Sequence, residues 1–328
     1  MAGTKRLSRG ATAWVALAAS FVSLFCAALT QAETLFDYQL QPVQVAEGTW
    51  VISGVPEDFS RSNGGNIVNI GFIETDAGVV LIDTGPSLRY AQQLEAAVAQ
   101  VTSQPIVAAI ITHHHPDHWF GNQHFKTLPI YALPETLSAM INEGDNFADN
   151  LYRMSGDWMR STEPTPANQT LTDNTLSIGD HTFQLIKLKG HTVGDLAVLD
   201  TNTGVLFAGD LAFDQRAPTT PHADIDTWLA ALDRLGDIDY RLLVPGHGQP
   251  APDDRAIQFT RHYLLWLQNL LWQSAQVGDV PTDVINKPIP AAFQEASLVR
   301  EELSRSVIHL YPGLEANTLA THKQGGYN

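Results

Sequence analysis

Short apolar runs of strand length alternate along the chain with longer segments in which apolar residues recur at helical spacing. The predicted strands cover residues 38–45, 49–53, 67–74, 79–83, 106–111, 182–188, 196–199, 204–208 and 241–244. The predicted helices cover residues 87–101, 225–235, 256–275 and 291–310. Strand pairs followed by β-α-β units predict an α/β protein: an αββα sandwich of two mixed β-sheets, with helices on the outer faces.

One insert interrupts this alternation. Residues 136–165 hold every methionine of the chain except the initiator. Two interpretations stand: a lid that places an adaptable apolar face over a cleft, or two ordinary helices that bury their apolar sides. After Gly278 the chain becomes rich in proline and then helical again. We therefore predict one domain over residues 33–277 and a helical extension of that domain over residues 278–328.

The first 32 residues have the pattern of a secretory signal peptide. Lys5, Arg6 and Arg9 precede an apolar stretch over residues 14–29, and Ala32 offers a cleavage site. We predict export to the periplasm or the medium, with no stable membrane anchor after cleavage; an uncleaved anchor is the alternative. Because the only cysteine, Cys26, lies in this stretch, a metal site in the mature chain must use His, Asp, Glu or water.

The acidic net charge of the chain limits the kinds of molecule that it is expected to bind. The formal net charge is −16, and no cluster of Lys or Arg occurs beyond the first ten residues. A partner with a phosphate backbone is therefore not expected, and nucleic-acid binding is excluded from the prediction. We expect a small-molecule substrate.

A histidine cluster is the strongest chemical signal. Residues 112–118 read Thr-His-His-His-Pro-Asp-His and directly follow the predicted buried strand 106–111. Imidazole and carboxylate groups are the protein ligands of zinc and related metals. The segment therefore predicts a metal-binding loop at one end of a sheet, against the alternative of a solvated polar loop.

Four further segments share one arrangement: a short strand-like run leads to an Asp or His flanked by glycine. These residues are Asp83, His191, Asp210 and His247. Glycine lets the backbone bend and approach closely, and open sheets gather their ligands at the carboxyl ends of strands. Each segment alone is more often an ordinary turn than a ligand site, so only the set predicts a site.

In this order and at these separations, the motifs resemble those of the metallo-β-lactamase superfamily, over residues 49–248. The motifs are His-x-His-x-Asp-His, Gly-His, Gly-Asp and Gly-His. The resemblance implies a site for two divalent ions, first Zn²⁺, with Fe or Mn as alternatives. Its implied ligands are His113, His115 and His191 for one ion, Asp117, His118 and His247 for the other, and Asp210 as a bridge between both. Asp83 would support the ligands from behind, and His114 matches no ligand position.

The resemblance also implies the chemistry. A hydroxide shared by the two ions would attack a carboxyl derivative such as a thioester, ester or amide. Asp117 would orient this hydroxide and assist proton transfer. Asp210 favours the ligand set of glyoxalase-II-type hydrolases, because true β-lactamases usually carry Cys or Ser there. The segment 58–72 is similar to that of exported quinoprotein relay system zinc metallohydrolases. Its polar loop 57–66 is expected either to border the active site or to form a plain hairpin.

Three other functions remain open from the sequence. They are a mononuclear iron persulfide dioxygenase, a true β-lactamase, and a non-catalytic partner of a periplasmic quinoprotein dehydrogenase. Among the remaining histidines, His222 follows Asp210 closely and is a candidate for substrate contact. The others are interpreted as surface or core residues: His124, His181, His262, His309 and His322.

Overall fold

The computed structural model describes the backbone of residues 36–325 and the side chains of residues 36–318. The predicted signal peptide, residues 1–32, lies outside the described residues. Contacts divide the chain into Met1–Gln39 and Leu40–Asn328, and every element and site below belongs to the second unit. Within the described residues, no helix combines the length and apolarity that a membrane crossing requires.

The first sheet has seven strands in sequence order. They are β1 (Val43–Ala46), β2 (Thr49–Ile52), β3 (Ile70–Thr75), β4 (Gly78–Ile82), β5 (Ile106–Ile110), β6 (Ile130–Ala132) and β7 (Gln169–Thr170). The pairs from β1 to β4 are antiparallel, and those from β4 to β7 are parallel. The sheet is therefore mixed, as predicted.

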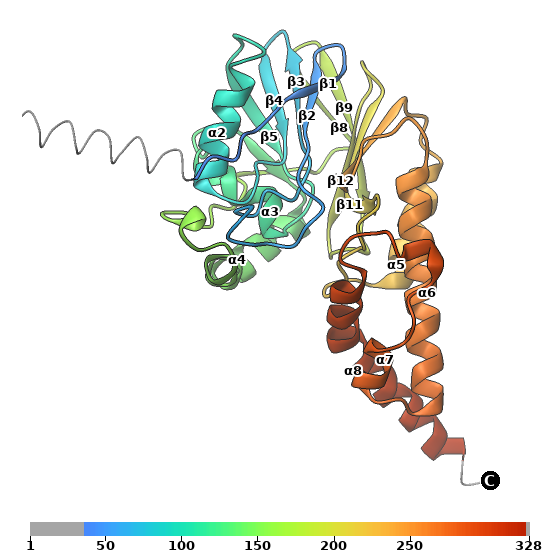
Figure 1. Cartoon of the computed structure of the whole chain (residues 1–328). Coiled ribbons are helices and arrows are strands. Elements are labelled where there is room, and N and C mark those ends of the chain that lie inside the picture. Colours follow the sequence, from blue (N-terminus) through green and yellow to red (C-terminus); the bar gives the residue numbers. More distant parts are fainter. Residues whose placement is uncertain (1–35, 326–328) are drawn as a thin grey trace, which may run out of the picture. The chain divides into compact units, whose positions relative to one another are not determined.

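The second sheet has five strands in the order β12-β11-β10-β9-β8. They are β8 (Thr175–Ile178), β9 (His181–Leu188), β10 (Asp195–Asp200), β11 (Val205–Phe213) and β12 (Leu242–His247). Only β11 and β12 run parallel; the other pairs are antiparallel. This second mixed sheet faces the first (Figure 1).

Helices complete the outer layers of the sandwich. The helices are α2 (Leu88–Val98), α3 (Pro116–Trp119), α4 (Pro134–Ser155), α5 (Ile225–Gly236), α6 (Arg255–Val277), α7 (Pro281–Ile285) and α8 (Val299–Gly325). The described part of the chain also forms three short 3₁₀ turns, η1 (Phe120–Gln123), η2 (Gly156–Met159) and η3 (Ala291–Phe293). Figure 1 shows α2 outside the first sheet and α5 and α6 outside the second. The predicted αββα fold is confirmed.

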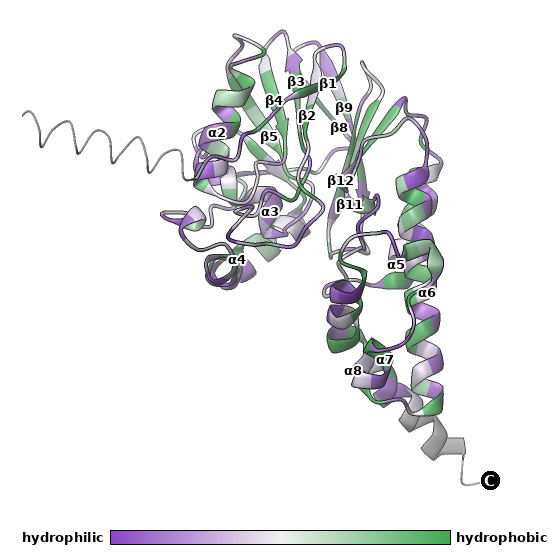
Figure 2. Cartoon of the chain, in the orientation of Figure 1, coloured by the Kyte–Doolittle hydropathy of each residue, from purple (hydrophilic) through white to green (hydrophobic). Residues whose placement is uncertain are grey.

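The core lies between the sheets. Val80 and Ile82 of the first sheet pack with Phe183, Leu185 and other apolar residues of the second, all buried. A second apolar cluster fixes α5 and α6 to the outer face of the second sheet. Figure 2 shows apolar residues concentrated in the strands, whereas the helices carry both apolar and polar faces. Each buried aliphatic side chain contributes roughly 1.5–3 kcal/mol, so this shared core rigidly supports whatever the strand ends carry.

Several predicted boundaries were wrong. The first strand begins at Val43 rather than 38, and the helix predicted over 291–310 splits into η3 and α8. The insert 136–165 holds one long helix, α4 (Pro134–Ser155), and the short turn η2 in place of the two helices of one interpretation. Met140 and Met159 in this insert are buried, whereas Met154 lines a cavity. The insert therefore serves both the core and the site.

Candidate metal centre

The histidine-rich loop leaves β5 and enters the short helix α3, which begins at Pro116. The backbone N–H of Thr112 donates to Asp83 Oδ1 at 2.8 Å, and Leu196 N–H of the second sheet donates to the Thr112 carbonyl at 2.8 Å. The loop is thus fixed to both sheets. The side chains of His113, His115, Asp117 and His118 are all buried.

The second sheet delivers three further donors to the same place. His191 follows β9 after Gly190, which has a φ of 138° that a residue with a side chain rarely adopts. His247 is the last residue of β12. Asp210 corrects the prediction, because it lies inside β11 and not at a strand end. The pairing of β11 with β12 shifts on both sides of Gly209, which has a φ of 52°. A bulge therefore presents the Asp210 carboxylate.

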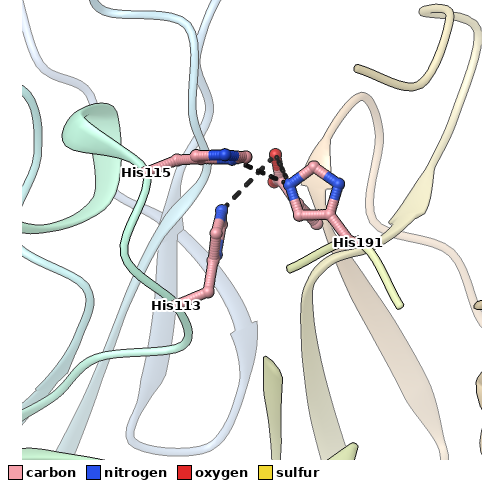
Figure 3. A group of neighbouring side chains, drawn as sticks. His113, His115 and His191 are labelled. Atoms are coloured by element: carbon pink, nitrogen blue, oxygen red, sulfur yellow. Dashed lines mark hydrogen bonds and ion pairs between the residues drawn. The ribbon is translucent and has the colours of Figure 1, made fainter. Parts of the chain in front are cut away.

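The first group of donors comprises His113, His115, His191 and Asp210, with one ligand atom of each within 4.8 Å of all the others. Asp210 Oδ2 lies 3.4 Å from His191 Nε2 and 3.8 Å from His113 Nε2. His115 Nδ1 lies 2.9 Å from His191 Nε2. Figure 3 shows the three imidazoles converging from the loop and from the second sheet.

The second group comprises Asp117, His118 and His247, again with ligand atoms within 4.8 Å. His247 Nε2 lies 3.5 Å from Asp117 Oδ2. Asp210 contacts this group too: Oδ1 is 3.2 Å from His118 Nε2, and Oδ2 is 3.3 Å from His247 Nε2. The structure thus brings all seven predicted ligands together, with Asp210 between the two groups.

The far nitrogens of three rings have partners of their own. His118 Nδ1 lies 2.7 Å from Asp83 Oδ2, and His247 Nδ1 donates to the Ile67 carbonyl at 2.7 Å. His113 Nδ1 lies 3.1 Å from the Thr112 hydroxyl. An imidazole that binds a cation through one nitrogen carries its single proton on the other, so these bonds would hold that proton on Nδ1 and leave Nε2, which faces the centre, to the cation.

The donor set fits a metal. His113 Nε2, His118 Nε2 and Asp210 Oδ1 are buried and have no hydrogen-bond partner. A buried polar atom without a partner destabilises the fold by about 1–3 kcal/mol. Three such atoms in one place therefore indicate that they bind one shared partner. Tetrahedral zinc ligands at 2.0–2.2 Å lie about 3.3 Å apart, which is close to the separations found here. Nitrogen and oxygen donors without sulfur suit Zn²⁺, Fe or Mn.

The electrostatics point the same way. Burial lowers the pKa of His191 to about 3 and the pKa of His113 and His115 well below the usual range, so these rings are neutral bases at pH 7. Burial alone would raise the pKa of Asp210, but His247 and His118 outweigh it and hold that pKa well below its usual range. The anionic Asp210 beside the neutral rings of His113, His115 and His191 favours a cation between them.

A cavity of about 330 Å³ opens onto this centre, with His115, Asp117, Asp210 and His247 in its wall. Its apolar lining consists of Phe59, Ile67, Pro116, Phe147, Leu151, Met154 and Pro221. Two larger cavities, of about 780 and 630 Å³, touch none of the donors, so we place substrate binding in the smaller one. The loop 57–66 and helix α4 both border it, through Phe59 and Phe147.

Sequence reasoning missed the charged residues of this cavity. Arg305 of α8 pairs with Asp58 and, at 2.7 Å, with Glu302, and Arg216 lies 3.7 Å from Glu302. The four charges therefore neutralise one another. No motif marks these residues, since Asp58 and Arg216 lie far along the chain from their partners Arg305 and Glu302 in α8. The only local signal was the polar character of loop 57–66, which contains Asp58.

The remaining histidines divide into two kinds. His124 pairs with Glu95 at 2.6 Å and His181 with Asp200 at 3.0 Å, both outside the centre. His114, His115 and His222 instead form a third group of possible donors. Burial lowers the pKa of His114 to about 4, and His222 adds to the shift. His309 lines the cavity, and the side chain of His322 lies outside the described residues.

Comparison with known proteins bears on the whole arrangement. Residues 63–247 match the family described as the Metallo-beta-lactamase superfamily. An acyl-coenzyme A thioesterase of Gallus gallus is 24% identical over 233 residues, which cover 64% of this chain and 82% of that protein. An atrochrysone carboxyl ACP thioesterase of Aspergillus fumigatus is 25% identical over 221 residues, covering 64% and 63%.

Solved structures agree on the fold. A metallo-beta-lactamase from Pontibacter korlensis superposes with a TM-score of 0.55 at 22% identity, covering 69% of this chain and 99% of that one. The likeness concerns the sandwich of sheets and helices.

Proposed function

The chain belongs to the metallo-beta-lactamase superfamily and is a hydrolase, and from that premise we propose that it uses two metal ions to hydrolyse a carboxyl derivative, with a thioester as the first candidate. The observation that carries the proposal is the position of Asp210. Its Oδ1 lies 3.2 Å from His118 Nε2, and its Oδ2 lies 3.4 Å from His191 Nε2. A carboxylate that faces both donor groups suits a bridge between two ions.

In this proposal His113, His115 and His191 hold one ion, and Asp117, His118 and His247 hold the other. Zn²⁺ is the first candidate, with Fe and Mn as alternatives. When bound, two such ions lower the pKa of a water and polarise a substrate carbonyl. What the protein adds is a fixed set of imidazoles, whose outer nitrogens are held by Asp83, the Ile67 carbonyl and the Thr112 hydroxyl.

Asp117 is the residue we assign to proton transfer. It lines the cavity, and its Oδ2 lies 3.5 Å from His247 Nε2 and 3.8 Å from His118 Nε2. Burial raises the pKa of Asp117, which makes the carboxylate a stronger base. Asp117 would orient the attacking water, take its proton and deliver that proton to the leaving group.

The cavity supports a substrate with an uncharged acyl part. Phe59, Phe147 and Leu151 offer apolar contact, and the arginines beside them are already paired with Asp58 and Glu302. The thioester itself is taken from the names of the related thioesterases. An ester or amide of similar shape would fit the same lining.

Two measurements on the purified protein test the proposal. Elemental analysis should give two metal equivalents, and a panel of a thioester, an ester, a lactone and a β-lactam should show hydrolysis, fastest for the thioester. A single iron with O₂ consumption would indicate a persulfide dioxygenase instead. Hydrolysis of the β-lactam alone would indicate a β-lactamase, and no turnover of any substrate would favour a non-catalytic partner.

The role of Asp117 has its own test. Asp117→Asn should lower kcat by at least about 100-fold, because an amide cannot take the proton. Asp145→Asn, at an exposed position of α4, is the matched control and should keep full activity. If Asp117→Asn retained full activity with both metals bound, the assignment would be wrong.

We further propose that the hydrolase is exported. The support is the sequence alone: Lys5, Arg6 and Arg9 before the apolar stretch 14–29. Expression of the full chain in a Gram-negative host should place activity in the periplasmic fraction, and mass spectrometry should find Glu33 as the first residue. Cytoplasmic protein with an intact N-terminus would contradict export and leave the chemistry untouched.

A further inference from the structure

His222 lies against the outer side of a predicted metal ligand. It belongs to the loop between β11 and α5, and its Nδ1 is 2.8 Å from His115 Nε2. The other nitrogen of His115, Nδ1, faces the centre, 2.9 Å from His191 Nε2. The His115 ring therefore stands between the proposed ion site and His222.

The direction of this hydrogen bond follows from the proton count of imidazole. If Nδ1 of His115 binds an ion, as the proposed function requires, the single ring proton sits on Nε2 and is donated. His222 Nδ1 must then accept it, and His222 carries its own proton on Nε2. That nitrogen lies 3.9 Å from the Glu143 carboxylate of α4, which favours a proton there.

The loop that carries His222 is held firmly. Thr220 Oγ1 lies 2.6 Å from Ser306 Oγ of α8, and the Thr219 hydroxyl donates to Glu302 Oε1 at 2.9 Å. On the other side, the N–H of Asp224 donates to the Gly190 carbonyl at 2.8 Å. The C-terminal helix thus fixes one side of the loop, and the residue before His191 fixes the other.

We propose that His222 is a positioning residue for His115, with Glu143 behind it. By accepting from Nε2, His222 sets the tautomer and the ring orientation of His115 and makes its Nδ1 a better donor to the ion. This inference rests on the proposed two-metal function and adds to it a contact that connects α4, the 214–224 loop and α8 to the first ion.

His222 as a ligand of a third ion is the competing assignment, because His114, His115 and His222 also have ligand atoms within 4.8 Å. The single proton that each of the His115 and His222 rings carries argues against a third ion. An ion on His222 Nε2 would put the proton on Nδ1, directly against the Nε2 proton of His115. An ion on His222 Nδ1 would displace the hydrogen bond to His115 altogether.

The test compares two substitutions of His222 in the full-length protein. In His222→Asn the side-chain oxygen takes about the place of Nδ1 and can still accept, whereas His222→Leu removes the acceptor. His222 has a side chain that is 40% exposed, so neither change threatens the fold. His309→Leu, at another histidine of the cavity wall, is the matched control.

The readouts are the dissociation constants of both Zn²⁺ ions, from chelator competition, and the visible spectrum of the Co²⁺-substituted protein. We expect His222→Leu to weaken the first ion about 10–100-fold and to change the Co²⁺ spectrum. His222→Asn and His309→Leu should stay within about threefold of the wild type, and the second ion should be unaffected in all variants.

Two results would overturn the inference alone. One is wild-type affinity and an unchanged spectrum in His222→Leu with both ions bound. The other is a third zinc equivalent in the wild type that both His222 variants lose. A wild type that binds no ion at His115 would overturn the proposed function, and this inference with it.

Discussion

The Nδ1 atom of His118 lies 2.7 Å from Oδ2 of Asp83, a carboxylate whose backbone is held at a φ of 63°. This left-handed conformation is unusual outside glycine, and aspartate is among the residues that tolerate it best. The other oxygen of Asp83 accepts the Thr112 N–H at 2.8 Å. One strained residue therefore fixes both the start of the histidine loop and the orientation of His118.

Substitution of Asp83 should weaken the second ion. Asp83→Asn tolerates the same backbone conformation but loses the charge that strengthens His118 as a ligand, so we expect about 10–100-fold weaker Zn²⁺ binding by chelator competition. Asp200→Asn is the matched control, because Asp200 is buried and pairs with His181 at 3.0 Å outside the centre. Equal affinities in the two variants would argue against a supporting role for Asp83.

A single methyl group should disrupt the bridge. A Cβ at Gly246 would collide with Oδ1 of Asp210, whereas one at Gly236 would meet nothing within 4 Å. Gly246→Ala should therefore push Asp210 aside and reduce bound metal from two equivalents to one or none, with a native far-ultraviolet spectrum. Gly236→Ala should keep both equivalents, as measured by elemental analysis.

Removal of metal should lower stability. A ligand that binds only the folded state at 1,000 times its dissociation constant adds about 4 kcal/mol, so chelation should lower Tm by several degrees. The comparison is Asp210→Ala, which lacks the shared carboxylate and should show little change of Tm with chelator. A wild-type Tm that ignores chelator and added Zn²⁺ would count against a bound pair of ions.

Glu302 gives a prediction about pH that does not depend on metal. Burial raises the pKa of Glu302 despite Arg216 and Arg305, so the folded state keeps this proton to higher pH than the unfolded state does. The wild type and Glu302→Gln should therefore have about equal free energies of unfolding at acid pH, where both side chains are neutral. As pH rises above the ordinary glutamate range, the free energy of unfolding of the wild type should fall below that of the variant. Urea unfolding at several pH values measures the difference, and a difference that grows in the opposite direction would refute the assignment.

Local patterns were enough to predict most of the fold. The apolar runs of β4 and β5 and the helical spacing of α5 and α6 depend on neighbours in sequence, and all four elements form where expected. The short strands β6, β7 and β8 were missed: β6 has only three residues, and β7 and β8 are exposed or half-buried and lack an apolar run. Helical structure in the insert 136–165 was one of two interpretations, but the structure has one long helix, α4, where two were expected.

The residues of the centre that belong to a motif could be predicted from the sequence, whereas the residues around them could not. The ligands stand beside glycines or in one loop, so their order along the chain signals them. The bond between His115 and His222 joins residues 107 positions apart, and Arg305 meets Asp58 across 247 positions. Such pairs follow from the packing of α8 and the loops, which no local spacing encodes.

The donors of the centre are divided between the two sheets. His113, His115, Asp117 and His118 follow β5 of the first sheet, whereas His191, Asp210 and His247 belong to the second. Ions held by both sets would cross-link the halves of the sandwich, as a disulfide does, in a chain whose only cysteine is Cys26. Reducing agents should then leave the protein intact, and the supply of metal, rather than the redox state of its surroundings, would decide how strongly the two halves are held together beyond their shared apolar core.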